Sequence, residues 1–165
     1  MSDKARNPSV FASARELREY LAPLRAGGKT LVTTNGCFDL IHRGHIQYLF
    51  EAASFGDLLV VGINSDASVK RLKGPDRPLQ NENDRAAIVG SLKMVDAAFI
   101  FSEDDPREFV EILRPDIHAK GGDYPKDMIE TPVVEKYGGK VVIVSLVQGF
   151  STTSIVSRIH HSERR

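Results

Sequence analysis

The chain carries the stretch Asn35-Gly36-Cys37-Phe38-Asp39-Leu40-Ile41-His42-Arg43-Gly44-His45. A β-branched run at residues 31–34 precedes it and predicts a short buried strand. Residues 46–54 follow it, with apolar side chains at helical spacing. The sequence therefore predicts a strand, a loop with two glycines and the start of a helix. Such a helix start suits a phosphate group, because its unpaired N–H groups and the helix dipole both favour an anion.

Two histidines, His42 and His45, flank a glycine in this loop and are the candidate catalytic residues. An imidazole donates a ring N–H bond to a phosphate oxygen, and does so more strongly when it is protonated. Gly36 and Gly44 lack a Cβ, which lets backbone N–H groups approach a bulky anion. The alternatives are histidines that only cap the loop, or a zinc site. The missing third ligand and the absence of the pattern His-Glu-x-x-His disfavour zinc.

Strands and helices are expected to alternate along the rest of the chain. The expected strands are residues 31–34, 57–64, 98–101, 117–120 and 141–144. The expected helices are residues 13–25, 46–54, 82–92, 106–113, 133–137 and 152–159, and residues 70–74 are interpreted as a basic loop. This order predicts a single α/β domain with a Rossmann-like, doubly wound, parallel sheet of five strands. Ligands of such sheets bind at the carboxyl ends of the strands.

Length and charge limit the function classes. The 165 residues correspond to about one domain, and 22 basic residues balance 22 acidic ones. This balance argues against nucleic-acid or membrane-surface binding, which leaves small molecules as the expected partners. No apolar run approaches the length of a spanning helix, and the first residues lack the apolar core of a secretory signal. The single cysteine, Cys37, fits a reducing cytoplasm. We expect a domain at residues 29–160, between an N-terminal extension with a helix (1–28) and a loose tail (161–165).

The spaced residues Gly36-x-Phe38-Asp39-x-x-His42-x-Gly44-His45 resemble the signature of the nucleotidyltransferase (cytidylyltransferase-like) superfamily at every fixed position. Further landmarks follow in the order that the superfamily shows. They are Asn64-Ser65-Asp66, Lys70-Arg71-Leu72-Lys73-Gly74, Arg85, Val95-Asp96 and Gly149-Phe150-Ser151-Thr152-Thr153. The resemblance covers residues 30–159, which is most of the chain.

Within the superfamily, three stretches resemble the adenylyltransferases of ADP-heptose synthesis. They are Lys73-Gly74-Pro75-x-Arg77-Pro78-Leu79, Lys120-Gly121-Gly122-Asp123-Tyr124 and Ser151-Thr152-Thr153-Ser154-Ile155. Glycerol-phosphate cytidylyltransferases usually carry Arg-Thr where this chain has Leu146 and Val147, which favours ATP over CTP. Those adenylyltransferases are often fused to a sugar kinase. Since the chain holds no kinase segment, the resemblance implies the stand-alone form.

The resemblance implies transfer of AMP from ATP to D-glycero-D-manno-heptose 1-phosphate, which yields ADP-heptose and pyrophosphate for the lipopolysaccharide core. It also implies Mg²⁺ with ATP as co-substrate, and a homo-oligomer. Two alternatives stay open. One is a cytidylyltransferase acting on glycerol 3-phosphate or another small phosphorylated acceptor. The other is a non-catalytic nucleotide-sensing module, which the presence of both histidines and of the basic loop disfavours.

The resemblance also assigns roles to residues. The implied catalytic residues are His42, His45 and Lys73, with Lys70 as the second candidate for a mobile cation. The implied nucleotide-binding residues are Asn35, Gly36, Cys37, Phe38, Gly44, Lys120, Gly121, Ser151, Thr152 and Thr153. The implied acceptor-binding residues are Asp39, Arg85 and Asp123, and no metal ligand is assigned.

Structural alternatives stay open for several of these residues. Lys73 also fits a solvated loop, Arg85 a surface ion pair and Asp39 a loop cap. Asp123 also fits a turn, and residues 151–153 fit an ordinary helix cap. Cys37 reads as a small buried residue and His118 as a core histidine.

Overall fold

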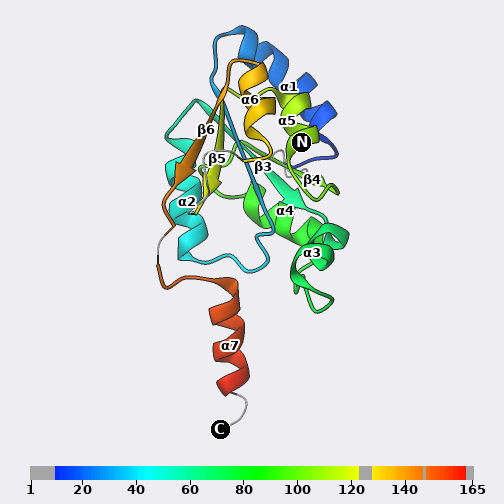
Figure 1. Ribbon diagram of the computed structural model, residues 1–165, viewed down its shortest axis with the longest axis vertical. Helices are drawn as coiled ribbons and strands as arrows, with labels where there is room; N and C mark the ends of the chain where they lie inside the picture. Colours follow the sequence, from blue (N-terminus) through cyan, green and yellow to red (C-terminus); the bar gives the residue numbers. More distant parts are fainter. Residues whose placement is uncertain (1–9, 123–127, 147, 163–165) are drawn as a thin grey trace, which may run out of the picture.

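The computed structural model describes residues 10–122, 128–146 and 148–162, and these form one α/β domain around a parallel sheet (Figure 1). The sheet has six strands in the order β1-β4-β3-β2-β5-β6. The strands are β1 (Val10–Phe11), β2 (Leu31–Gly36), β3 (Leu58–Asn64), β4 (Ala97–Phe101), β5 (Ile117–Gly121) and β6 (Lys140–Val144). The predicted fold class is confirmed.

The predicted number of five strands is wrong, because β1 adds a sixth at the edge of the sheet. It pairs in parallel with β4, with Val10 opposite Ala98 and Phe11 opposite Phe99. A strand of two residues is too short to show an alternating pattern, so the sequence gives no signal for it.

Helices cover both faces of the sheet, as a doubly wound fold requires. The helices are α1 (Ala14–Ala26), α2 (Arg43–Ala53), α3 (Asp66–Lys73), α4 (Glu82–Gly90), α5 (Arg107–Leu113), α6 (Thr131–Lys136) and α7 (Thr152–Ser162). Side chains of α2 and α4 join one core cluster, and side chains of α1, α5 and α6 join the other. The α7 helix extends away from the sheet, beyond the carboxyl ends of the strands (Figure 1), and none of its residues is buried.

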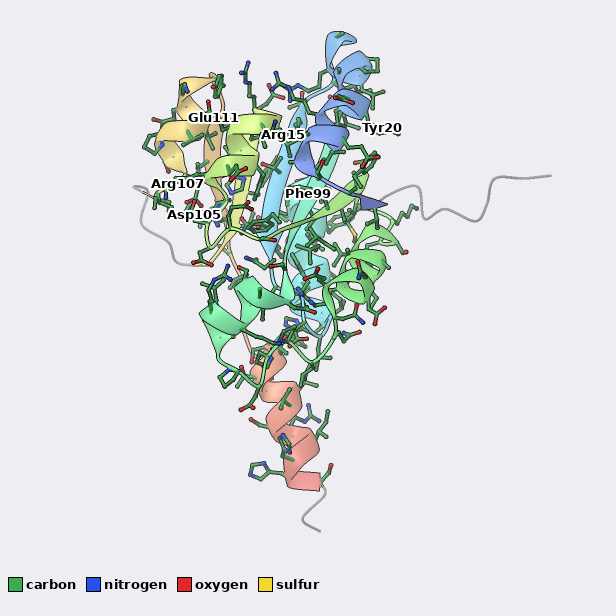
Figure 2. All side chains as sticks on the ribbon, turned by 90° about the vertical axis from the view of Figure 1, so that its right-hand side faces the viewer. Arg15, Tyr20, Phe99, Asp105, Arg107 and Glu111 are labelled. Atoms are coloured by element: carbon green, nitrogen blue, oxygen red, sulfur yellow. The ribbon has the colours of Figure 1, made fainter. Side chains whose placement is uncertain are left out.

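The central strand β3 shows why these strands are continuously apolar. All of its residues are buried. Leu59, Val61 and Ile63 pack in the cluster of α2 and α4, whereas Leu58 and Val60 pack in the cluster of α1 and α5. Phe99 of β4 lies in the second cluster, between the sheet and the α1 and α5 helices (Figure 2). A strand covered on both faces has no polar side to alternate with.

The segment interpreted as a basic loop is instead the helix α3. The Ser65 hydroxyl accepts a hydrogen bond from the Ser68 N–H at 3.2 Å and so caps the helix start. Asp66 lies in the first turn and Lys70, Arg71 and Lys73 in the last, which complements the helix dipole. The cluster of basic residues therefore marks the end of a helix.

Aspartates fix the amino ends of the two central strands. The Asp116 carboxylate accepts from the Leu31 N–H at 2.7 Å, and the Asp96 carboxylate accepts from the Leu59 N–H at 2.7 Å. The strand β2 then pairs with β3 on one side and β5 on the other. Because the chain crosses from β4 to β5 past β2, the topological switch lies beside β2. This is the position at which sheets of this kind bind ligands.

Candidate functional site

A cavity of about 830 Å³ opens at the carboxyl ends of β2, β3 and β5. Its wall takes side chains from the loop after β2, from the end of α3, from the end of β5 and from the start of α7. The structure brings most of the predicted site residues together here. They are Asn35, Gly36, Cys37, Phe38, Asp39, His42, Gly44, His45, Lys73, Lys120, Gly121, Ser151, Thr152 and Thr153.

The two histidines stack at the start of α2. His42 is the N-cap residue, and its Nδ1 accepts a hydrogen bond from the His45 N–H at 3.4 Å. The rings lie 3.7 Å apart between centroids and 18° from parallel. The His45 ring also contacts Phe38, with 5.1 Å between the ring centroids. Because His42 Nδ1 is an acceptor, the neutral ring carries its proton on Nε2, where it can be donated to a ligand.

Burial keeps both imidazoles neutral at physiological pH. It lowers the pKa of His42. Burial and the neighbouring His42 lower the pKa of His45 to about 4, against the opposing effect of the Leu40 carbonyl. Two stacked rings do not both accept a proton in a partly desolvated site. The pair therefore presents neutral N–H donors to a phosphate rather than two positive charges.

Glycines allow the rings to pack this closely. A Cβ on Gly44 would lie 3.0 Å from Nδ1 of His42 and 3.2 Å from the Phe150 Cβ. A Cβ on Gly36 would lie 2.8 Å from Cε2 of Phe38. Phe38 itself has a φ of 47°, in the left-handed region that disfavours bulky residues. The loop thus makes room for rings as well as for a ligand.

Asp39 is buried and its carboxylate is fully engaged by the protein. It accepts from Arg77 Nε at 2.6 Å, from the Leu79 N–H at 2.8 Å and from the Gln80 N–H at 3.0 Å. Burial would raise the pKa of Asp39, but these hydrogen bonds and the charge of Arg77 outweigh it and lower the pKa. These contacts fix the loop 77–80, and a role of Asp39 in acceptor binding stays a prediction.

Arg85 is not part of the cavity wall. Its side chain is fully buried, and it donates to the Gln80 carbonyl at 2.9 Å, the Cys37 carbonyl at 2.6 Å and the Asp66 carboxylate at 2.8 Å. Arg85 therefore links the loop after β2, through Cys37, to the first turn of α3, through Asp66. Asp123, the other predicted acceptor-binding residue, lies outside the described residues.

Lys120 reaches the cavity from β5 inside a polar cluster. Its ammonium lies 3.0 Å from Glu130 Oε1 and 3.1 Å from Asn35 Oδ1. Behind it, Nδ1 of the buried His118 lies 2.8 Å from Thr33 Oγ1. Burial, and then the charge of Lys120, lowers the pKa of His118 to about 3, so this ring is a neutral core residue.

The remaining charges of the cavity are mostly paired. Asp104 binds Arg71 at 2.7 Å, and Asp105 binds Arg107 at 2.9 Å beside the start of α5 (Figure 2). Lys73 has no ion-pair partner within the described residues and adds an uncompensated positive charge. Burial raises the pKa of the Cys37 thiol, which disfavours a thiolate nucleophile.

The described part of the chain shows neither a metal cluster nor a membrane-spanning helix. There, no three His, Cys, Asp or Glu side chains converge in an arrangement that would hold a metal ion. Within the same residues, no helix combines the length and the apolar character that crossing a bilayer requires.

Arg77 and Glu130 line the cavity, but sequence reasoning does not single them out as site residues. Arg77 lies in a stretch that resembles the adenylyltransferases of ADP-heptose synthesis, but no local pattern marks its contact with Asp39. Glu130 is separated by ten residues from Lys120 and has no motif around it.

A parallel sheet with neutral imidazoles, a helix start and an unpaired lysine around one cavity defines an α/β enzyme for phosphorylated ligands. Residues 33–163 match the model of the cytidylyltransferase-like family, and the chain belongs to this family. It is accordingly a nucleotidyltransferase.

Its relatives include longer proteins. The bifunctional protein HldE of Syntrophotalea carbinolica is 54% identical over 144 residues, which cover 87% of this chain and 29% of that protein. HldE of Geotalea uraniireducens is 56% identical over 157 residues, covering 93% and 32%. The chain thus spans about 30% of the length of these curated relatives.

The similar solved structures include one from Thermoplasma volcanium and one from Francisella tularensis. The lipopolysaccharide core biosynthesis protein from Thermoplasma volcanium GSS1 has a TM-score of 0.60 and 36% identity, and covers 73% of this chain and 98% of its own. Pantoate-beta-alanine ligase from Francisella tularensis, complexed with beta-gamma ATP and beta-alanine, has a TM-score of 0.53. Its 14% identity, over 95% of this chain and 79% of its own, supports the fold alone.

Proposed function

We propose that the chain transfers AMP from ATP to D-glycero-D-manno-heptose 1-phosphate and releases ADP-heptose and pyrophosphate. Relatives above 50% identity support this choice, as does a solved structure named for lipopolysaccharide core biosynthesis. The observation that carries the proposal is the neutral, stacked pair His42 and His45. It shares one cavity with the start of α7 and with Lys73.

In the proposed reaction, a phosphate oxygen of the acceptor attacks the α-phosphorus of ATP. The new oxygen–phosphorus bond forms as the bond to pyrophosphate breaks, so no covalent enzyme intermediate is needed. The chain's own residues then act by positioning and by fixed electrostatics. His42 and His45 donate ring N–H groups to the α-phosphoryl oxygens, where charge builds up. Lys73 closes over the reacting phosphates and offsets their charge.

The rest of the cavity holds the nucleotide in this proposal. Ser151, Thr152 and Thr153 offer N–H and hydroxyl donors to the outer phosphates at the start of α7. The adenine lies beside Lys120 and Gly121. Bound together with the triphosphate, Mg²⁺ would offset part of the charge of its phosphates.

A substrate-panel assay tests the proposal. The four nucleoside triphosphates are each combined with heptose 1-phosphate, glycerol 3-phosphate and ethanolamine phosphate, and pyrophosphate release is followed. We expect turnover with ATP and heptose 1-phosphate. Turnover with CTP and glycerol 3-phosphate alone would instead establish a cytidylyltransferase. Nucleotide binding with no turnover on any acceptor would favour the sensing module.

A further inference from the structure

Arg77 lines the cavity from the loop between α3 and α4, and its side chain is 22% exposed. Only one part of its guanidinium is bound by the protein, since Nε donates to Asp39 Oδ2 at 2.6 Å. Within the described residues, neither Nη1 nor Nη2 has a hydrogen-bond partner. A planar guanidinium with two unengaged nitrogens matches the spacing of two phosphate oxygens.

The protein fixes the direction of this guanidinium through Asp39. The carboxylate also accepts from the backbone N–H groups of Leu79 and Gln80, and the Gln80 side-chain amide donates back to the Asp39 carbonyl. Asp39 is thereby hydrogen-bonded to Arg77 itself and to the two residues, Leu79 and Gln80, that follow it in the same loop. Hydrogen bonding and the nearby charge also lower its pKa, so it remains ionised. All hydrogen bonds of the buried Asp39 carboxylate go to this one loop, so its role is to position the loop.

Arg77 and Lys73 stand at a different part of the cavity from the histidines. They come from the end of α3 and the loop after it, whereas His42 and His45 come from the start of α2, on the other side of the molecule in Figure 1. Both cations act on Cys37, in the loop between these two groups. A phosphate in this cavity can therefore meet imidazoles from the α2 side and cations from the α3 side.

Charge pairing singles out the same place. Among the described residues, each carboxylate that lines the cavity already binds an arginine or a lysine, namely Asp39, Asp104, Asp105 and Glu130. In this part of the chain, the pairing leaves Lys73 as an uncompensated charge and Arg77 as a donor with two unengaged nitrogens. A dianionic phosphate monoester satisfies both, whereas an uncharged acceptor satisfies neither.

We propose that Arg77 binds the phosphate group of the acceptor and that Asp39 is its positioning residue. The acceptor phosphate lies against the Nη groups of Arg77, while the triphosphate occupies the histidine side of the cavity. This inference rests on the proposed function, because it takes the second substrate to be a phosphate monoester. It adds a specificity determinant: the site selects acceptors by their phosphate before it selects them by their sugar.

Steady-state kinetics of Arg77→Gln and Arg77→Lys test the inference with heptose 1-phosphate and ATP. We expect Arg77→Gln to raise the KM for the acceptor about 10- to 100-fold, the usual loss for a hydrogen-bonded charge. The KM for ATP should change less than about twofold. Arg77→Lys should show a smaller rise in the acceptor KM than Arg77→Gln, because a lysine keeps the charge but lacks the paired donors of the guanidinium. Arg18→Gln, on the exposed face of α1, is the matched control.

Asp39→Asn tests the positioning role. Asp39→Asn should raise the KM for the acceptor, as Arg77→Gln does. In the double variant the acceptor KM should be no higher than in Arg77→Gln alone. A merely structural Asp39 would instead change both KM values together. Thermal melts show whether each variant is folded. Arg77→Gln with an acceptor KM within twofold of the wild-type value would overturn the inference.

A binding measurement separates failure of this inference from failure of the proposed function. Inorganic phosphate is titrated calorimetrically into the wild-type chain and into Arg77→Gln, both saturated with α,β-methylene-ATP. We expect weaker phosphate binding in the variant. If the wild type transfers nothing to heptose 1-phosphate, the proposed function fails, and this titration still decides the role of Arg77. Equal phosphate binding by both chains would contradict it.

Discussion

At the scale of single residues, the two stacked histidines are held by different forces. His42 is anchored by a hydrogen bond from the His45 N–H, and its ring remains partly open to the cavity. His45 packs against the His42 ring and against Phe38, and burial keeps it neutral. His45 is therefore a preorganised donor that needs little reorganisation when charge develops beside it.

Replacing His45 with alanine should lower kcat strongly while the fold survives. A preorganised donor of this kind supplies roughly 10²–10³ in rate, and we expect a loss of that size. The measurement is kcat with saturating ATP and heptose 1-phosphate, beside a thermal melt of the variant. Turnover within about threefold of the wild-type value, in a folded protein, would show that the ring does not contact the reacting phosphate.

His118 should make the stability of the chain depend on pH. Its pKa falls from 6.5 in a solvated state to about 3 in the buried site. Between these values the unfolded chain binds the extra proton, so the free energy of unfolding drops as the pH falls below 6.5. The slope that one such histidine contributes is about 1.4 kcal/mol per pH unit.

Chemical denaturation of the His118→Asn variant between pH 7 and roughly pH 5 measures this contribution. Asparagine keeps a polar atom near Thr33 but does not titrate, so its stability should fall less with decreasing pH than that of the wild type. His160→Asn, on the exposed α7, is the control. Parallel curves for the wild type and His118→Asn would contradict the buried neutral ring.

At the scale of elements, Gly44 at the start of α2 must both fit a helix and leave room for the His42 ring. Gly44 lies in a helix, where alanine is normally favoured by up to about 1 kcal/mol. Here a Cβ would meet the His42 ring at 3.0 Å and Phe150 at 3.2 Å. Since the ring end of His42 can move, we expect the cost to fall on the position of the imidazole rather than on folding.

The Gly44→Ala variant should thus keep its melting temperature within a few degrees and lose activity. A donor displaced by about 1 Å commonly costs about 10- to 100-fold in rate, and we expect kcat to drop in this range. Gln47→Ala, on the exposed side of the same helix, is the matched control. An active Gly44→Ala would mean that the ring has a second position from which it works equally well.

Periodicity predicts the longer elements of this fold well, and short or charged ones poorly. Apolar residues buried on both faces mark β3, and helical spacing marks α1, with Leu17 and Leu21 in the core. The helix α3 buries only Ser68 and Val69. Its apolar face is therefore too narrow to give a helical pattern in the sequence, where the basic residues dominate. The cap at Ser65 is the signal that identifies it.

At the scale of the whole molecule, the site is an assembly of distant segments. Sequence motifs predict the loop 35–45 and the start of α7, because glycine, histidine and hydroxyl patterns are local. The contact between Arg77 and Asp39 spans 38 residues and depends on how the α3–α4 loop packs, so no local pattern reveals it. The expected homo-oligomer, the cytoplasmic location and the role of Asp123 stay predictions.

The α7 helix should contribute to binding without contributing much to stability. It buries no residue, and Thr152 makes one hydrogen bond back to the body, to the Leu40 carbonyl at 3.4 Å. Yet Thr152 and Thr153 line the cavity. A chain that ends after Ser151 should therefore melt within about 4 °C of the full chain, a difference of about 1 kcal/mol, and should bind ATP about 10-fold more weakly or worse.

Calorimetric titration with ATP and a thermal melt check both parts of this prediction. Arg158→Ala, which leaves the helix start intact, should bind ATP like the wild type. A fall of more than about 10 °C on truncation would show that the helix packs on a surface in solution, contrary to its exposed position. If that fall depended on protein concentration, the surface would belong to a second copy of the chain, because only an intermolecular contact follows mass action.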